Sequence, residues 1–262
     1  MAFSMVATGC NSSDTEKETV VALETTAGTI RLKLYNDTPG HRDNFLQNVR
    51  DGLYDGVIFH RIIRNFMIQT GNPSTRPGEV IDTTKQDPTI PAEIVYPKYY
   101  HKRGSVAAAR ESDDKNPNRE SNKFQFYIVT GKHYSDAGLS EIESTAYQNK
   151  VDRINQELTA KHAEQLEALR QQRDRKGVAK MLDSLLYEAQ NFVADNPPAP
   201  LTQAQKRAYK SRGGSPWLDG EYTIFGEVIE GMKIVEDIEK IKTGKDNLPL
   251  HEIRIIKATV EE

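Results

Sequence analysis

Alternation of apolar and polar residues with a period of two restricts the fold of this 262-residue chain more than any other feature. Val20–Tyr35 carries VVALETT and TIRLKLY on either side of Ala27-Gly28, a pattern that predicts a half-buried β-hairpin. Further short strands are predicted from alternation, or from β-branched and aromatic content, at 57–69, 104–110, 124–130, 222–228 and 251–260. So many short strands predict a mainly β protein, built as a closed or nearly closed barrel.

One predicted helix lies near each end of this series of strands. Thr38-Pro39 is typical of a helix start, because a capping residue precedes a proline at the first helical position. Apolar residues follow at helical spacing, and they are Phe45, Leu46, Val49 and Leu53. The segment Met232–Ile241 shows the same spacing close to the C-terminus, so it predicts a second helix.

Residues 132–214 differ from the rest of the chain, because Glu, Gln, Ala, Leu, Lys and Arg dominate them. Ser140 and Glu143 fit a capping box at the start of a first helix. Two amphipathic helices joined near Gly177 would pack as a hairpin or against the barrel, and LTQAQKRAYK predicts a third, short helix. The predicted parts of the chain are a leader (1–19), a barrel (20–131 and 215–262) and a helical insertion (132–214).

Composition excludes several classes of function. Hydrophobic residues make up 37% of the chain, charged residues 28%, and the net charge is −3, so nothing indicates a nucleic-acid partner. Six histidines at scattered positions show no ligand spacing, and a single Cys10 leaves no second thiol, so neither a metal site nor an internal disulfide is predicted. No apolar run approaches the length of a bilayer-spanning helix.

Cys10 has a setting of its own. The small residues Ala7, Thr8 and Gly9 precede it, and the polar segment NSSDTEKE follows. This arrangement resembles the lipobox of a bacterial lipoprotein signal, in which the cysteine is lipidated. It predicts a protein of the bacterial cell envelope or periplasm, held to a membrane by lipid on Cys10 alone, with a start upstream of Met1. The alternative is a leader without such a role.

The stretch VIFHRIIRNFMIQTGNP places the cation Arg61 in a run of Val, Ile, Phe and Met. Burying a charge in apolar surroundings is costly unless something compensates it. By itself, an arginine in an apolar strand is more often a surface residue than a catalytic one.

The surrounding motifs favour catalysis. FHRIIRNFMIQTG resembles the cyclophilin signature, in which F-H-R is followed by four residues and then F-x-x-Q-x-G. HKRGSVAAAR, FQFYI and WLDGEYTIFGEVIEGMKIVEDI are similar to later family segments in the same order, so the resemblance covers 20–131 and 215–260. It implies an eight-stranded antiparallel closed β-barrel capped by two helices, with peptidyl-prolyl cis/trans isomerase activity and no cofactor or metal.

The resemblance also implies the roles of individual residues. Arg61 would donate a hydrogen bond to the prolyl nitrogen as the X-Pro bond turns, and an apolar pocket would hold the proline ring. The pocket positions are Phe66, Met67, Tyr127 and Leu218, and the other substrate-binding positions are Gln69, Ala109, Arg110, Gln125, Trp217 and Tyr222. Tyr127 stands where the family has Phe, so its hydroxyl needs a partner or a path to solvent.

The expected substrates are proline-containing peptides and unfolded client proteins, and Trp217 predicts binding of a cyclosporin-like ligand. A different class of function stays open because of the insertion. The barrel would then recognise proline segments while the helices grip a partner, as in a chaperone or interaction module. A stabilising strut or a dimerisation arm fits the same helices.

Overall fold

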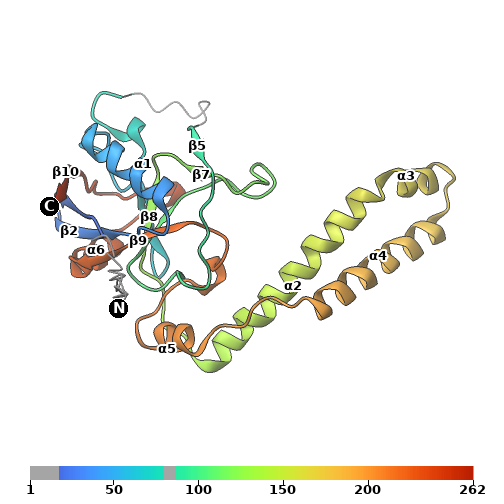
Figure 1. Cartoon of the computed structure of the whole chain (residues 1–262). Helices are drawn as coiled ribbons and strands as arrows, with labels where there is room; N and C mark the ends of the chain where they lie inside the picture. The colour runs from blue at the N-terminus through green and yellow to red at the C-terminus, as the bar shows by residue number, and fades with distance from the viewer. Residues whose placement is uncertain (1–17, 80–86, 262) are drawn as a thin grey trace, which may run out of the picture.

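The computed structural model describes residues 18–79 and 87–261 (Figure 1). Cys10 and the predicted leader up to residue 17 lie outside the described residues, so the lipid anchor stays a prediction. Residues 18 and 19 already belong to the barrel, because Glu18 pairs with Lys33 at 3.0 Å and the Thr19 carbonyl accepts the Leu34 N–H.

One antiparallel sheet of eight strands forms the body of the protein, which confirms the predicted mainly β fold. In sheet order, its strands are β10 (Ile255–Glu261), β1 (Val20–Thr25), β2 (Gly28–Leu34), β9 (Ile224–Glu230), β6 (Ser105–Ala108), β8 (Phe126–Val129), β4 (Met67–Thr70) and β3 (Arg61–Ile63). A separate two-stranded sheet joins β5 (Thr89–Ile90) to β7 (Ser121–Asn122).

The predicted closed barrel is not found, because no continuous ladder of strand pairs closes the sheet in the part of the chain that the structure describes. Within the described residues β10 and β3 are the two edges of the sheet, and no strand ladder joins them. The segment that leads into β3 meets the first residue of β10 and the segment before it, through an isolated bridge between Ile58 and Arg254 and a hydrogen bond of 2.9 Å from the Ile255 N–H to the Val57 carbonyl. The sheet is therefore strongly curled but open.

Two helices cover the core of the sheet. Helix α1 (Pro39–Arg50) packs against β10, and α6 (Met232–Glu239) packs against β2, β3 and β4. Their apolar faces bury Phe45, Val49, Val235 and Ile238 among the inward-facing residues of the strands. In the described part of the chain, three short 3-10 helices lie in connections, at Pro73–Thr75, Pro216–Leu218 and Lys245–Asn247.

Helix α1 begins where the sequence predicts, but its cap comes from elsewhere. The Thr38 side chain makes no capping hydrogen bond. Instead the Glu93 carboxylate accepts the backbone N–H groups of Gly40 and His41 at 3.0 and 2.8 Å, and the His41 ring Nδ1 at 2.6 Å. Burial acts to raise the pKa of Glu93, but these hydrogen bonds outweigh burial and lower it. Glu93 is thus a structural cap that ties a distant loop to α1.

The insertion contains four helices. They are α2 (Asp136–Lys161), α3 (Ala163–Gln171), α4 (Arg175–Asp195) and α5 (Gln203–Ser211). Helices α2 and α4 pack side by side around Val151, Ala189 and Val193, and with α3 they form an arm that projects away from the sheet (Figure 1). Helix α5 lies at the base of the arm, against the barrel.

The helix boundaries inside the insertion differ from the predicted ones. Ser140 lies inside α2, whose cap is Ser135, so the predicted capping box at Ser140 and Glu143 is wrong. The Glu143 carboxylate instead accepts the Leu201 N–H at 2.9 Å. The chain reverses at Gln172–Asp174, close to the predicted junction near Gly177, and Gly177 itself lies in the first turn of α4.

The insertion leaves and re-enters the barrel at one place, which we call the clasp and define as Gly131, Lys132 and Gly214. The Lys132 N–H donates to the Gly214 carbonyl at 3.2 Å, and the Gly214 N–H donates to the Lys132 carbonyl at 3.0 Å. Gly131 has a φ of 57°, and a Cβ on it would collide with the backbone of Gly214. Glycine is therefore required for the two ends to approach this closely.

The cap of α1 predicts a stability change. Glu93→Gln should lower the free energy of unfolding by about 1–2 kcal/mol at neutral pH, because a neutral amide cannot accept both N–H groups as an ionised carboxylate does. Urea unfolding measures this difference. Glu24→Gln, on an exposed position of β1, serves as the control and should change stability little.

The difference should also depend on pH. The pKa of Glu93 is lower in the folded protein than in the unfolded chain, so its contribution is present above the ordinary value of 4.5 and is lost as pH falls through the lowered value. The difference in free energy of unfolding between wild type and Glu93→Gln should therefore become smaller in acid. A difference that stays constant down to about pH 3 would contradict an ionic cap.

Candidate active site

The strands β4, β8 and β6 each serve two surfaces because side-chain direction alternates along a strand. Ile68 and Ile128 point into the core beneath α1 and α6. Met67, Tyr127 and Ala107 point to the other face of the sheet, where they belong to a second apolar cluster. One period-two pattern therefore builds the core and a separate outer surface from the same residues of the chain.

Strand register aligns the predicted catalytic residue with this outer surface. Arg61 on β3 is paired with Gln69 on β4, Gln69 with Tyr127 on β8, and Tyr127 with Ala107 on β6. Neighbouring strands lie about 4.8 Å apart, so Arg61 and Tyr127 stand about 10 Å apart across two ladders. The four residues form one row across four strands.

A line of side-chain amides holds Arg61. Its exposed guanidinium donates from Nη1 to the Gln69 Oε1 at 3.3 Å. Gln69 in turn donates from Nε2 to Gln125 Oε1 at 3.0 Å, and Gln125 donates from Nε2 to the Asp87 carboxylate at 2.7 Å. Because Asp87 can only accept, the line fixes which way both amides face and leaves the Gln69 oxygen toward Arg61. No ion pair involves Arg61 among the described residues.

The four predicted pocket residues lie together beside this row. Met67 and Tyr127 are buried, Phe66 and Leu218 are half-buried, and all four belong to one apolar cluster, here called the outer cluster. Its other members are Tyr35, Ile63, Tyr99, Ala107, Val129, Tyr222 and Ile224. Residues from five separate stretches of the chain thus supply one apolar surface next to a cation.

The Tyr127 hydroxyl has a buried partner. It lies 3.0 Å from Nε2 of His101, whose Nδ1 lies 3.1 Å from the Asp219 carboxylate. Burial raises the pKa of Tyr127 well above its ordinary value, so the hydroxyl keeps its proton and can donate it. His101 is fully buried, and its ring stacks with that of Tyr127 at 6.2 Å. The family difference at Tyr127 is therefore accommodated without exposing a polar group to the cluster.

Aromatic rings border the outer cluster on two sides. The indole of Trp217 lies 5.4 Å from the Phe66 ring and is 41% exposed. Tyr222 meets Tyr127 edge to face at 5.9 Å, and the Arg110 guanidinium lies 4.5 Å above the Tyr222 ring. Trp217 and Tyr222, two of the predicted substrate-binding residues, thus lie at the rim of the outer cluster, with both rings partly open to solvent.

Arg110 and Ala109 are engaged within the protein. The Arg110 side chain is 5% exposed, and it donates to the Glu221 carbonyl at 3.0 Å and to Asp113 at 2.6 Å. The Ala109 N–H donates to the Gln125 carbonyl, and its own carbonyl accepts the Asn122 N–H. The Arg110 side chain therefore steadies Tyr222 rather than reaching into solvent.

His60 is a half-buried, neutral side chain. Burial lowers its pKa to about 4, so at neutral pH it carries no charge beside Arg61. Within the described residues no group of His, Cys, Asp and Glu is placed to hold a metal ion. In the same part of the chain, no helix has the length and apolarity needed to span a bilayer.

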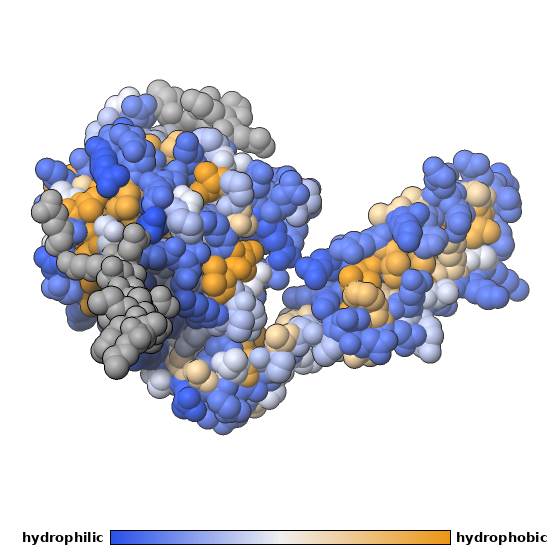
Figure 2. Space-filling model, in the orientation of Figure 1, coloured by the Kyte–Doolittle hydropathy of each residue, from blue (hydrophilic) through white to orange (hydrophobic). Residues whose placement is uncertain are grey.

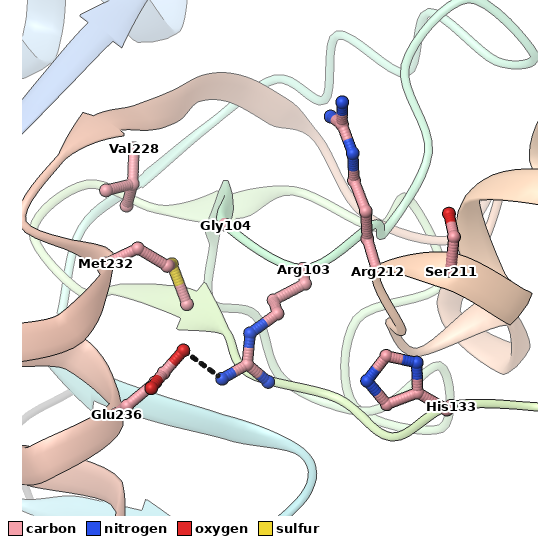
Figure 3. A pocket seen from close by; sticks show the side chains of 8 residues that line it. All are labelled: Arg103, Gly104, His133, Ser211, Arg212, Val228, Met232 and Glu236. Carbon is pink, nitrogen blue, oxygen red and sulfur yellow. Dashed lines mark ion pairs between the residues drawn. The ribbon is translucent and has the colours of Figure 1, made fainter.

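A cavity of about 440 Å³ lies apart from the outer cluster. Figure 3 shows Arg103 reaching toward Glu236, with which it pairs at 2.9 Å, while His133 and Arg212 line the other side. None of the predicted site residues lines this cavity. Its polar, open lining adjoins the base of the insertion and not the row that begins at Arg61.

Two residues of the site were not predicted from the sequence. His101 and Asp219 lie inside the motifs HKRGSVAAAR and WLDGEYTIFGEVIEGMKIVEDI, and nothing in the spacing of either motif sets them apart as site residues. The requirement for a partner of the Tyr127 hydroxyl was the signal that could have identified His101, the histidine in one of those motifs.

A family profile and individual relatives of the chain identify the same protein family. A profile of the family described as cyclophilin type peptidyl-prolyl cis-trans isomerase/CLD matches residues 20–260. A protein of Staphylococcus epidermidis is 26% identical over 255 residues, and one of Staphylococcus aureus strain USA300 is 27% identical over 258 residues. Both alignments cover 96% of each chain, and both proteins are named as candidate peptidyl-prolyl cis-trans isomerases.

Solved structures support the same fold. A crystal structure of a cyclophilin-type peptidyl-prolyl cis-trans isomerase of Cryptosporidium parvum matches with a TM-score of 0.54 at 20% identity, covering 94% of this chain and 98% of the other. A structure of the same protein in the presence of the dipeptide Ala-Pro matches with a TM-score of 0.53 at 21% identity, covering 93% and 99%.

The buried pairing of Tyr127 predicts a stability loss. Tyr127→Phe should lower the free energy of unfolding by about 1–3 kcal/mol, because it leaves Nε2 of His101 buried without a partner. The matched control is Tyr134→Phe, since the buried Tyr134 hydroxyl makes no hydrogen bond within the described residues. Equal stability of the two variants in urea would argue against the assigned partner.

Proposed function

Because the chain belongs to the cyclophilin-type peptidyl-prolyl cis-trans isomerase family, we propose that Arg61 and the outer cluster are the groups with which it accelerates rotation of X-Pro bonds. One observation carries this proposal. The guanidinium of Arg61 is held by Gln69 in the same strand row as Tyr127, beside an apolar surface made of Phe66, Met67 and Leu218. The reaction needs a hydrogen-bond donor for the prolyl nitrogen and an apolar surface that holds the proline ring. A cation next to an apolar surface matches both needs.

The first need is electronic. An amide resists rotation because nitrogen shares its lone pair with the carbonyl, which gives a barrier of about 18–20 kcal/mol. In the twisted transition state the nitrogen is pyramidal and has regained this lone pair. A hydrogen bond from Arg61 to that nitrogen is therefore stronger in the transition state than in the ground state, as catalysis requires. A charge-assisted bond of about 1.5–3 kcal/mol would supply about one to two orders of magnitude in rate.

The second need is mechanical. The proline ring must stay in place while the preceding carbonyl turns. The outer cluster offers an apolar surface for the ring, in which Phe66 and Leu218 are half-buried and Met67 and Tyr127 are buried. Gln69 accepts a hydrogen bond from Arg61, which supports its proposed role in orienting the guanidinium, and it is the proposed polar partner of the substrate carbonyl.

The substrates proposed are proline-containing peptides and unfolded clients. Support comes from the related structure determined in the presence of Ala-Pro, which is a small ligand with the same reacting bond. The exposed ring of Trp217 beside Phe66 would extend the apolar surface, and it is the residue on which binding of a cyclosporin-like ligand would depend.

The role of Arg61 is tested by substitution. Arg61→Ala should lower kcat/KM on an X-Pro peptide by about 10- to 100-fold in a protease-coupled assay. Arg61→Lys should also be impaired, because an ammonium group lacks the planar fork that Gln69 orients. Arg153→Ala, an exposed site on α2, is the control and should keep the wild-type rate. Equal rates for wild type and Arg61→Ala would refute the proposed role.

A second function is favoured by the shape of the arm. Three large side chains on α4 stay exposed there, Leu182 at 37%, Tyr187 at 66% and Phe192 at 48%. Figure 2 shows apolar side chains gathered along this part of the surface, well away from the sheet. An exposed apolar surface on a projecting element suits contact with unfolded chains. We propose that the arm adds a chaperone contact to the isomerase.

Substitutions on the arm separate the two functions. The double variant Tyr187→Ser with Phe192→Ser should keep the wild-type turnover of a short X-Pro peptide. About fivefold more of it should be needed to suppress aggregation of an unfolded client, since an aromatic anchor contributes about 1 kcal/mol or more. Lys180→Ser, on the same helix, is the control. A change in oligomeric mass with unaltered suppression would instead identify a dimerisation arm.

A further inference from the structure

A buried chain of hydrogen bonds connects the insertion to the outer cluster. The Tyr209 hydroxyl on α5 donates to Oδ2 of Asp219 at 2.6 Å. Oδ1 of Asp219 accepts from the backbone N–H of His101 at 2.8 Å and lies 3.1 Å from its ring Nδ1. Nε2 of His101 lies 3.0 Å from the Tyr127 hydroxyl. Three contacts thus lead from an inserted helix to a residue beneath the proposed proline site.

The direction of each hydrogen bond follows from the chemistry of the groups. A carboxylate accepts only, so Nδ1 of His101 carries a proton beside Asp219, and Nε2 of a singly protonated ring accepts. Tyr127 must then donate to His101, which turns its hydroxyl hydrogen away from the outer cluster. Tyr209 and His101 are fully buried, and the side chains of Asp219 and Tyr127 are about one-twentieth exposed. Water is therefore a poor substitute for any member of the chain.

Tyr209 reaches two residues of the proposed proline site through this chain. Asp219 directly follows Leu218 in the sequence, and Leu218 and Tyr127 both belong to the outer cluster. The Tyr209 ring also packs against Tyr134 at 6.3 Å, and Tyr134 lies 6.5 Å from the rim residue Trp217. Removing the Tyr209 hydroxyl would leave one oxygen of a buried carboxylate without its donor.

We propose that Tyr209 is a positioning residue for the proline site, so that helix α5 of the insertion is part of the machinery that shapes substrate binding. The inference rests on the proposed function of Arg61 and the outer cluster. Tyr209 touches no substrate. It acts through Asp219 and His101 on Leu218 and Tyr127, the residues that would hold the proline ring.

Kinetics on the full-length protein test the proposal. Tyr209→Phe keeps the ring and removes only the hydroxyl. It should raise KM for an X-Pro peptide by about 3- to 10-fold, the size typical of substitutions along a coupled network, and leave kcat within about twofold. Trp217 is the only tryptophan of the chain, so its fluorescence gives the peptide Kd independently, and that Kd should rise in parallel.

A double-mutant cycle distinguishes positioning from simple support of α5. In a Tyr127→Phe background, Tyr209→Phe should raise KM less than it does in the wild type, because the route through His101 is already broken and only the route through Leu218 remains. Tyr134→Phe is the matched control in the same aromatic cluster and should keep the wild-type KM. A folded Tyr209→Phe variant with unchanged KM, or effects of the two substitutions that simply multiply, would overturn the proposal.

A measurement on the wild type covers the case in which Tyr209→Phe does not fold. Coupling is reciprocal, so a saturating X-Pro peptide should slow amide hydrogen exchange in α5, at Gln203–Ser211, without changing exchange in α3. Unchanged exchange in α5 would overturn the inference. Wild-type protein without turnover would instead refute the proposed function, whereas turnover with an insensitive α5 would refute only the role of Tyr209.

Discussion

The alternation of side-chain direction along β4, β8 and β6 is the constraint on which the rest of the structure depends. Because every second residue faces the core, Ile68 and Ile128 can bury their side chains while Met67 and Tyr127 remain on the opposite face. A shift of one residue in register would exchange these two sets and destroy both surfaces. Stability and the proposed chemistry are therefore encoded by the same strands and cannot vary independently.

Much of this arrangement could be predicted from local sequence. The strands follow from period-two patterns, and the motif around Arg61 places Phe66, Met67 and Gln69 within a few residues of it, on β3, β4 and the turn between them. The sequence predicts a closed barrel, whereas the sheet of the structure is open. Register shifts, as between Arg31 and Leu32, bend the ladders without leaving a sequence signature, so the pairing of the outermost strands could not be predicted.

Contacts between distant segments could not be predicted for a related reason. Glu93 lies 52 residues from His41, and Tyr209 belongs to an insertion whose docking depends on the folded barrel. Local patterns were also misleading where helix formation extended further than expected. Ser140 fits the start of a helix, but the residues before it are themselves helical and Ser135 is available as the cap.

The arm has a consequence that follows from its length. Helix α2 has 26 residues, and at 1.5 Å per residue it extends for about 39 Å from its base near the clasp. An extended polypeptide covers about 3.4 Å per residue, so this reach equals about a dozen residues. The length of α2 therefore sets a minimum separation between two points of attachment, one at the tip of the arm and one beside the barrel. A flexible chain that touched the far tip while presenting a proline beside the barrel would need a spacer of at least that order between its two points of attachment.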